Sequence, residues 1–318
     1  MKKLLAGVFM GAMLALAGTA QADDYPEKPV TVIIPSAAGS SMEIQLRIMQ
    51  PKMEEVLGQP IVLVAAPGAG TVTGSRQVKD SDPDGYTVLI NHLAMHSPYI
   101  LGKSDFNYKD FEVSAFTFTQ PMMVMAKKGA YDSLIDLLEQ SAAAPDTILA
   151  GVNIGGLNHL AVALAQASYK GASFRYIQTG GTVPSVTSLL GGQTQVGGIG
   201  AGETMPYVED IDMLAVLDHQ RYPQAPDVPT FAELGLPDIR LALDTAFFMP
   251  KGTPQAAVDK FADALEAAME DSKVQDSLTK LGLVVDFRRG EAAQQAVADG
   301  YQVVLEAAKA AGLNKVDE

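Results

Sequence analysis

Cysteine and tryptophan are both absent from the 318 residues, and basic side chains are few. Without cysteine the chain has no disulfide bond, no thiolate metal site and no cysteine nucleophile. Only 23 Lys and Arg residues stand against 37 Asp and Glu, so the formal net charge is -14. This charge disfavours binding to the phosphates of nucleic acids. The composition is nevertheless 47% hydrophobic, and this length suits two domains with sizeable cores.

No apolar run is long enough to cross a membrane. Lys2 and Lys3 precede the longest one, Leu4 to Ala17, and its roughly 14 residues fall short of the roughly 20 that a bilayer requires. Small residues follow in Ala20-Gln21-Ala22, at the spacing that a signal peptidase reads. We therefore expect residues 1–22 to be a signal peptide cleaved after Ala22, rather than a membrane anchor, and the mature protein to be exported.

Short runs of Val, Ile and Leu alternate with stretches of helical period, which is typical of α/β domains with parallel strands. In the first unit, a strand at Val30 to Ile34 leads through the loop Ser36 to Ser41 into a helix at Met42 to Leu57. Its apolar face should include Ile44, and Gly58 should end it. Further strands are expected at Ile61 to Val64, Tyr86 to Ile90, Met122 to Ala126, Thr147 to Val152, Ser173 to Ile177, Gln195 to Ile199, Met213 to Leu217 and Leu283 to Phe287.

The C-terminal part of the chain reads as helical. Thr253 can cap a helix that begins at Pro254, and a last helix follows Gly290. A second series of strands starts near residue 120, so the pattern predicts two αβ domains joined by ordered segments.

Two glycine motifs partly match known nucleotide-binding patterns. Gly102-Lys103-Ser104 resembles the end of a P-loop, but Ser97 stands where that motif requires its first glycine. The alternating glycines from Gly198 to Gly202 lack the dinucleotide-binding spacing. We therefore predict no nucleotide site and no cofactor.

Catalytic and metal-binding patterns are also missing. His92 and His96 are four residues apart, but no Glu lies between them as a zinc protease motif requires. The G-x-S-x-G nucleophile elbow of serine hydrolases does not occur. The sequence thus predicts neither a metal site nor a catalytic residue.

Loops of small residues directly follow several expected strands, namely Ser36 to Ser41, Asn153 to Asn158, Thr179 to Thr182 and Gly198 to Gly202. The carboxyl ends of such strands meet at one crevice. Where a loop enters a helix, unpaired N–H groups and the positive end of the helix dipole can hold a carboxylate without Lys or Arg. The alternative is that these glycines serve only tight turns.

These loops and their surroundings resemble the periplasmic solute-binding proteins of tripartite tricarboxylate transporters, the Bug family. The resemblance rests on six segments in the family's order and near its spacing: Tyr25-Pro26-Glu27-Lys28-Pro29-Val30 with Pro35 and Ala38-Gly39, Pro67-Gly68-Ala69-Gly70, Pro83-Asp84-Gly85-Tyr86-Thr87, Leu189-Leu190-Gly191-Gly192-Gln193, Asp227-Val228-Pro229-Thr230-Phe231 and Pro250-Lys251-Gly252-Thr253-Pro254.

The resemblance implies a type II periplasmic-binding-protein fold, with a ligand cleft between two lobes joined by crossing strands. The first lobe would comprise residues 23–120 and 247–318, and the second residues 121–246. The protein would be a periplasmic monomer without enzymatic activity. It would capture a small organic acid, either a di- or tricarboxylate or an aromatic acid, and deliver it to the membrane subunits of the transporter.

The ligand-binding residues that the resemblance implies come from the loops of both lobes. They are Ser36, Ala38, Gly39, Ser40 and Ser41 in the first lobe, Asn153, Gly155, Gly156, Asn158, Thr179, Gly180 and Gly181 in the second, and Gly200, Ala201 and Glu203 near the crevice. Asn91 and His92 are further candidates. Phe247 is expected either to form an apolar wall of the site or to belong to the core.

Two other functions stay open on the sequence. A sensory co-receptor for a membrane kinase would use the same closed form of the protein. A periplasmic serine hydrolase would need Ser40 or Ser41 to act with His159.

Overall fold

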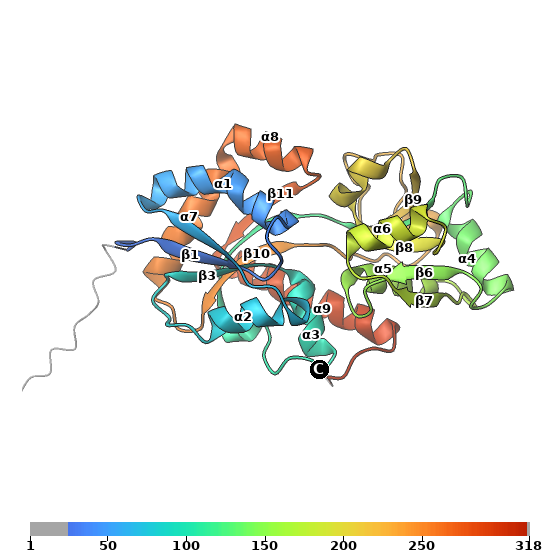
Figure 1. The fold of residues 1–318 in the computed structure, drawn as a ribbon, viewed down its shortest axis with the longest axis horizontal. Coiled ribbons are helices and arrows are strands. Elements are labelled where there is room, and N and C mark those ends of the chain that lie inside the picture. Colours follow the sequence, from blue (N-terminus) through green and yellow to red (C-terminus); the bar gives the residue numbers. More distant parts are fainter. Residues whose placement is uncertain (1–24, 317–318) are drawn as a thin grey trace, which may run out of the picture.

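The computed structural model describes residues 25–316, so the expected signal peptide and its cleavage site lie outside the described residues. The chain forms two lobes that lie side by side, each with a β-sheet between helices (Figure 1). This arrangement confirms the expected α/β fold with two lobes. Within the described range, no helix combines the length and the hydropathy needed to cross a membrane.

The sheet of the first lobe is built from two parts of the chain that are distant in sequence. Strand β1 pairs in parallel with β2 and β3, whereas β10 runs antiparallel to β3 and β4, and β11 antiparallel to β4. In the described residues the strand order is β11-β4-β10-β3-β1-β2. The strands are β1 (Val30–Ile34), β2 (Ile61–Ala65), β3 (Thr87–His92), β4 (Phe111–Thr119), β10 (Thr245–Pro250) and β11 (Val284–Arg289).

The sheet of the second lobe comes from one continuous part of the chain. Strand β6 pairs in parallel with β7 and β8, and β5 runs antiparallel to β8 and β9. The described strands have the order β7-β6-β8-β5-β9. They are β5 (Met122–Lys127), β6 (Leu149–Val152), β7 (Arg175–Gln178), β8 (Val196–Gly200) and β9 (Ile211–Leu217).

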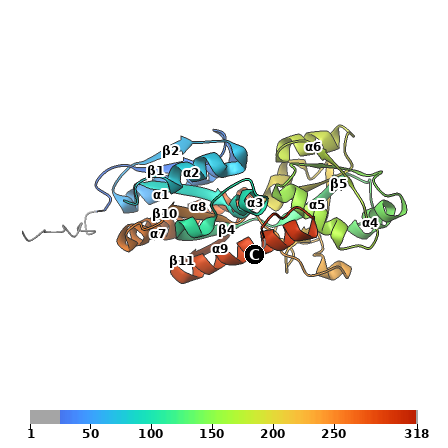
Figure 2. The ribbon, with the colours of Figure 1, turned by 90° about the horizontal axis from the view of Figure 1, so that it is seen from below.

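Helices cover both faces of each sheet (Figure 2). In the first lobe α1 packs against α7 and α8. The α-helices are α1 (Ser41–Leu57), α2 (Val72–Lys79), α3 (His96–Ile100), α4 (Leu134–Ala143), α5 (Leu157–Ala167), α6 (Thr182–Leu190), α7 (Gln255–Glu270), α8 (Ser272–Lys280) and α9 (Gly290–Ala310). Short 3₁₀ turns are η2 (Ala69–Thr71), η3 (Leu93–Met95), η4 (Tyr108–Asp110), η5 (Ala201–Tyr207) and η6 (Ala232–Leu234).

Two local expectations differ from the structure. Ile44 is 45% exposed, because α1 turns Met42, Leu46 and Met49 toward the core instead. Thr253 does not cap α7, since its hydroxyl donates to the carbonyl of Pro250 and the helix begins at Gln255.

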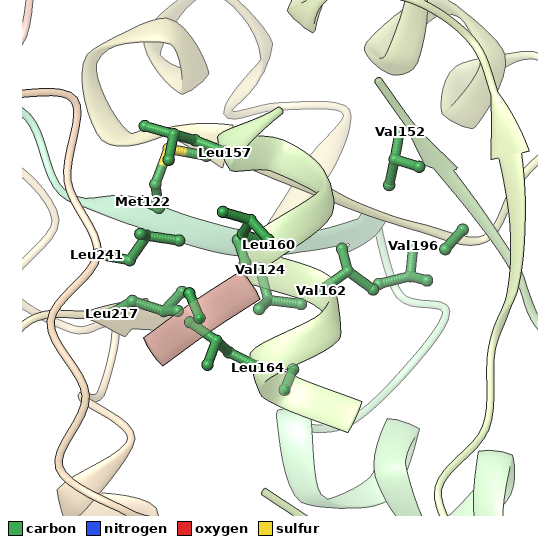
Figure 3. Packing of buried hydrophobic residues seen from close by; sticks show 14 of the residues in the cluster. Met122, Val124, Val152, Leu157, Leu160, Val162, Leu164, Val196, Leu217 and Leu241 are labelled. Carbon is green, nitrogen blue, oxygen red and sulfur yellow. The ribbon is translucent and has the colours of Figure 1, made fainter. Parts of the chain in front are cut away.

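The core of the second lobe forms where α5 lies across its sheet. Leu160 and Leu164 are on the side of α5 that faces Val124 of β5, with Leu217 and Leu241 beside them (Figure 3). Nine of the eleven residues of α5 are buried, which explains why this helix is apolar almost all round. The core therefore fixes α5 firmly, and with it the loop that precedes it.

The crossings between the lobes are paired extended segments. The N–H of Met122 donates to Leu241, and the N–H of Leu243 donates to Gln120, at 2.8 and 2.7 Å. Arg240 makes two 2.8 Å hydrogen bonds to the buried carboxylate of Asp244. Thr119 donates to the same carboxylate.

The lobes also touch away from these crossings. Tyr222 of the second lobe donates its hydroxyl to Gly282, at 2.6 Å, in the turn between α8 and β11. Helix α9 packs on β4 in the first lobe and on α5 in the second, as its course below both lobes indicates (Figure 2). Its residues Tyr301, Val304 and Leu305 belong to the core of the second lobe, although the division expected from the sequence gave all of 247–318 to the first.

Candidate functional site

A pocket of about 470 Å³ lies between the two lobes. The first lobe contributes η2, the segment from Ala94 to Lys103 and, through the crossing strands, Leu243. The second lobe contributes Met122, the loop before α5, the start of α6 and Glu203 of η5. This volume is within the range of sites for small molecules.

The loop from Asn153 to Asn158, which the sequence offered as a candidate for binding a ligand, forms one wall of the pocket. Its backbone amides are largely used within the lobe. The N–H of Asn153 donates to the side chain of Asn158, that of Ile154 to Gln178 and that of Gly155 to His159. The N–H of Gly156 donates to the carbonyl of Asn153 at 2.7 Å. These bonds hold the loop in shape. In the first turn of α5 the N–H of His159 donates to the side chain of Asn158, so Leu157 and Asn158 supply the remaining donors of this helix end.

Two helices begin at the pocket. Gly156 and Gly181 are the N-cap residues of α5 and α6, and both line it. The N–H groups in the first turn of a helix have no acceptor within that helix, and the helix dipole makes this end positive. Leu157 and Thr182, the first residues of the two helices, also line the pocket. The second lobe therefore presents two positive helix ends to the same space.

Glu203 lies beside the start of α6. Thr182 donates its hydroxyl to this carboxylate at 2.9 Å. The amide oxygen of Gln120, in the orientation that satisfies its neighbours, accepts the N–H groups of Gly202 and Glu203 at 2.8 and 3.1 Å. Burial raises the pKa of the Glu203 carboxyl, and the hydrogen bond from Thr182 opposes that rise. Glu203 is thus a positioned, partly buried carboxylate in the wall of the pocket.

The wall from the first lobe includes a cationic side chain. Lys103 lies in the turn after α3, where its N–H donates to the carbonyl of Pro98 at 2.7 Å. Its Nζ atom is 3.8 Å from the position that a Cβ atom would take at Gly155 of the second lobe. Ser97, also in this wall, is 5% exposed, and its hydroxyl has no hydrogen-bond partner. This wall therefore offers one ammonium and one unpaired hydroxyl.

The loop between β1 and α1 is not among the residues that line the pocket. This loop holds Ser36, Ala38, Gly39, Ser40 and Ser41. The N–H of Gly39 donates to Glu43 at 2.7 Å, and Glu43 also pairs with Arg47. The amide predicted to hold a ligand is therefore occupied by a side chain of its own helix in this structure.

Other candidate residues also lie outside the pocket lining. Asn91 is buried and donates to Ser75, and burial lowers the pKa of His92 to about 4. Thr179 hydrogen bonds to Ser185, Gly180 precedes the α6 cap, and Gly200 and Ala201 connect β8 to η5. Phe247 is 0% exposed and packs on Phe261, so it belongs to the core, one of its two expected positions.

Of the candidate residues, the structure brings together Asn153, Gly155, Gly156, Asn158, Gly181 and Glu203. The wall from the first lobe, especially Gly70, Ser97 and Lys103, was not predicted from the sequence. Signals for these residues existed. The glycines of residues 67–70 come shortly after β2, and Lys103 belongs to the incomplete P-loop motif.

The residues required for a hydrolase are not assembled. His159 is in α5, where its Nδ1 atom accepts the N–H of Gly155 and its ring packs edge-on against Tyr176. No hydrogen bond within residues 25–316 joins His159 to Ser40 or Ser41. The described residues also contain no cluster of three His, Asp or Glu side chains that could hold a metal ion.

Comparison with known proteins agrees with this architecture. The model of the family described as "Tripartite tricarboxylate transporter family receptor" matches residues 45–311. The protein BugT of Bordetella pertussis is 30% identical over 318 residues, which cover 95% of each chain. The structure of the periplasmic binding protein BugD is 29% identical and has a TM-score of 0.79, covering 92% of this chain and 100% of that one.

A third relative was solved with a ligand. MatC from Rhodopseudomonas palustris, with bound malate, is 26% identical, has a TM-score of 0.77 and covers 89% of this chain and 99% of that one. These similarities confirm the two-domain periplasmic-binding-protein fold and a family of binding proteins, not of enzymes. The chain therefore belongs to the Bug family of solute-binding receptors of tripartite tricarboxylate transporters.

Proposed function

We propose that this receptor captures a small organic carboxylate in the pocket between its lobes and delivers it to the membrane subunits of a tripartite tricarboxylate transporter. It acts as a monomer in the periplasm after cleavage of its signal peptide following Ala22. One observation carries the proposal: the positive ends of α5 and α6 and the ammonium of Lys103 meet at one pocket. Helix N-termini and ammonium groups both favour a carboxylate.

The position of the pocket explains how binding can report to a partner. Its walls come from both lobes, so a ligand that contacts both stabilises a closed arrangement more than an open one. The crossing strands at Gln120 and Leu243 provide ordered connections at which a small change of backbone angles can close the lobes. The transporter would then recognise the closed surface.

The malate bound in MatC supports the ligand class, since that relative shares the fold over most of its length. Malate is small enough for a pocket of about 470 Å³.

Calorimetric titration with malate and a panel of di-, tri- and aromatic carboxylates tests the proposal, with Gly181→Val as the variant. Gly181 has an ordinary negative φ of -74°, and a Cβ atom there meets nothing within 4 Å, so the fold should tolerate the change. The valine side chain should obstruct the start of α6. We expect at least about a tenfold loss of affinity, because a displaced carboxylate loses the N–H groups it would contact.

Ala167→Val, at the exposed far end of α5, is the matched control and should bind like the natural protein. Absence of binding for every carboxylate, or full affinity in Gly181→Val, would contradict the proposal. A transport assay with the membrane subunits separates this role from that of a sensory co-receptor.

A further inference from the structure

Two glycines meet across the boundary between the lobes. Gly202 is in η5 of the second lobe, and Gly282 is in the turn between α8 and β11 of the first. A Cβ atom at Gly202 would overlap the carbonyl oxygen of Leu281 and lie 2.8 Å from the Cα atom of Gly282. A Cβ atom at Gly282 would overlap the Cα atom of Gly202. The two backbones are therefore in direct contact, and neither position has room for a side chain.

Hydrogen bonds from the second lobe hold the same turn. The hydroxyl of Tyr222 donates to the carbonyl of Gly282, and the side-chain amide of Gln224 donates to the carbonyl of Thr279, both at 2.6 Å. Tyr222 is 1% exposed and belongs to an apolar cluster of the second lobe, against which Val284 at the start of β11 also packs. The contact thus combines backbone, polar and apolar groups.

The segments on both sides of this contact are held in place within their own lobes. On the side of the first lobe, the N–H groups of residues 281–283 donate to carbonyls in the last turn of α8. On the side of the second lobe, the side chain of Gln120 accepts the N–H of Gly202, and the N–H of Ala201 donates to Pro121, at 2.8 Å each. Because Gln120 belongs to the crossing strands, the contact is attached directly to the connection between the lobes.

The contact also lies close to the axis about which the lobes can turn. Val284 of β11 pairs with Thr119, at the end of β4 where the chain crosses to the second lobe. Strand β2 is at the opposite edge of the first sheet. Since neighbouring strands are about 4.8 Å apart, β2 is roughly 14 Å from the crossing strand β10, whereas β11 is one spacing from β4. In a rigid rotation about the crossings, the turn before β11 therefore moves less than β2 does.

Helix α9 joins the lobes on the other side of the crossing strands. It packs on β4 of the first lobe and on α5 of the second. Figure 1 shows α8 near the upper edge of the boundary between the lobes and α9 near its lower edge, with the crossing segments between them. Contacts on both sides of the crossings favour one movement of the lobes, a rotation about the line that joins these contacts.

We propose that the contact of Gly202 and Tyr222 with the turn between α8 and β11 is a pivot of lobe closure. It persists while the lobes open and close, and the β2 edge of the first lobe moves toward the second lobe. Tyr222 and the two glycines are positioning residues, since Glu203 of the pocket wall directly follows Gly202. This inference rests on the lobe movement in the proposed function and does not depend on which carboxylate binds.

Distances between pairs of spin labels, measured by pulsed electron paramagnetic resonance, test the inference. The chain has no cysteine, so each double-cysteine variant carries labels only at the two chosen positions. One label is always at Thr187 on α6, and the other is at Lys280 beside the turn or at Val62 in β2; all three side chains are exposed. The two pairs therefore differ only in how far the label of the first lobe lies from the pivot.

In the ligand-free protein we expect the distance distribution of the Val62 pair to be at least about twice as wide as that of the Lys280 pair, because its label lies farther from the axis. Saturating malate, or the carboxylate of the panel that binds most tightly, should shorten the Val62 distance. The mean Lys280 distance should stay nearly unchanged.

Gly202→Ala and Tyr222→Phe disturb the contact in different ways. The added methyl group presses on the carbonyl of Leu281, whereas the phenylalanine keeps the ring but lacks the hydroxyl that bonds to Gly282. Each should widen the Lys280 distribution toward that of the Val62 pair. Tyr169→Phe is the matched control and should change neither distribution, because the Tyr169 hydroxyl contacts Glu139 within the second lobe. Thermal unfolding of each variant checks that it folds.

Three results overturn the inference. The first is a natural protein in which the Lys280 pair is as widely distributed as the Val62 pair. The second is an equal shift of both pairs with ligand, and the third is an unchanged Lys280 distribution in every folded one of the two variants. If no carboxylate binds, the proposed function fails, while the ligand-free distributions still decide whether the contact is a pivot.

Discussion

Asp244 is the residue on which the polar contacts at the lobe crossing depend. Its carboxylate is 3% exposed and accepts hydrogen bonds from Arg240 and from Thr119. In Asp244→Asn the guanidinium of Arg240 keeps its charge but loses its ionic partner. Breaking a buried ion pair from one side is strongly unfavourable, so we expect the free energy of unfolding to fall by about 3 kcal/mol in urea titrations.

Asp286→Asn provides a matched comparison, because Asp286 pairs with Arg288 nearer the surface. Its loss should lower the free energy of unfolding by less than about 1 kcal/mol. Equal effects of the two substitutions would mean that the ion pair at the crossing contributes no more to the free energy of unfolding than the pair nearer the surface.

His96 makes the stability sensitive to acid. It is buried between the rings of Tyr108 and Tyr301, and burial lowers its pKa to about 3. In the unfolded chain the pKa returns to about 6.5, so on acidification the unfolded state gains a proton before the native state does. Stability is then lost as the pH falls below about 6.5, by up to about 1.4 kcal/mol per pH unit from this residue.

His96→Phe should show a smaller loss of unfolding free energy between pH 7 and pH 5 than the natural protein. Urea titrations at the two pH values measure this loss in both proteins. The difference between the two losses removes the contributions of the other titrating groups. An identical loss in both proteins would show that His96 does not titrate in this way.

The residues of the site were predictable to the extent that they follow strands. The loop from Asn153 to Asn158 was found because small residues come directly after a β-branched run. Lys103 was not, since it lies in a turn after a short helix and its role depends on contact with Gly155, which is about fifty positions away in sequence. Contacts between lobes, made by residues far apart in the sequence, leave no local sequence pattern from which they could be predicted.

At the scale of elements, α1 was predicted well because Met42, Leu46, Met49 and Met53 are buried at helical spacing, and most central strands because they are short runs rich in apolar residues. Strands β4 and β10 were not among the strands expected from the sequence. Nearly all their residues are buried, from Phe111 to Phe118 and from Thr245 to Pro250. In β4 the polar Ser114 and Thr117 are buried as well, so its polar residues do not mark an exposed face. The break between α7 and α8 was also missed, although Asp271 caps the second helix.

Helix α9 allows a test of whether the two lobes unfold together. Leu305 is 1% exposed and lies in the core of the second lobe, whereas earlier residues of the same helix pack in the first. Leu305→Ala should lower the free energy of unfolding by about 3 kcal/mol through the cavity it leaves. Because one helix packs in both cores, calorimetric unfolding should retain a single transition.

Val62→Ala, at a side chain that is 45% exposed, is the control and should change the unfolding free energy by less than about 1 kcal/mol. If Leu305→Ala instead divides the transition into two, the lobes unfold independently and α9 does not couple them.

At the scale of the molecule, the two lobes and their α/β class follow from the order of runs along the sequence. The position of the antiparallel strands does not. Strand β10 enters the first sheet between β3 and β4, beside segments that precede it by more than a hundred residues. Only tertiary packing selects that partner, and the same packing decides which loops reach the pocket.

The course of α9 has a consequence for biogenesis. A polypeptide is synthesised from its N-terminus, and Tyr301, Val304 and Leu305 follow all strands of the second lobe along the chain, so they are made after that lobe's sheet. Until they are made, the second lobe exposes the apolar surface that they cover. The core of the second lobe is therefore completed only after α9 has been synthesised.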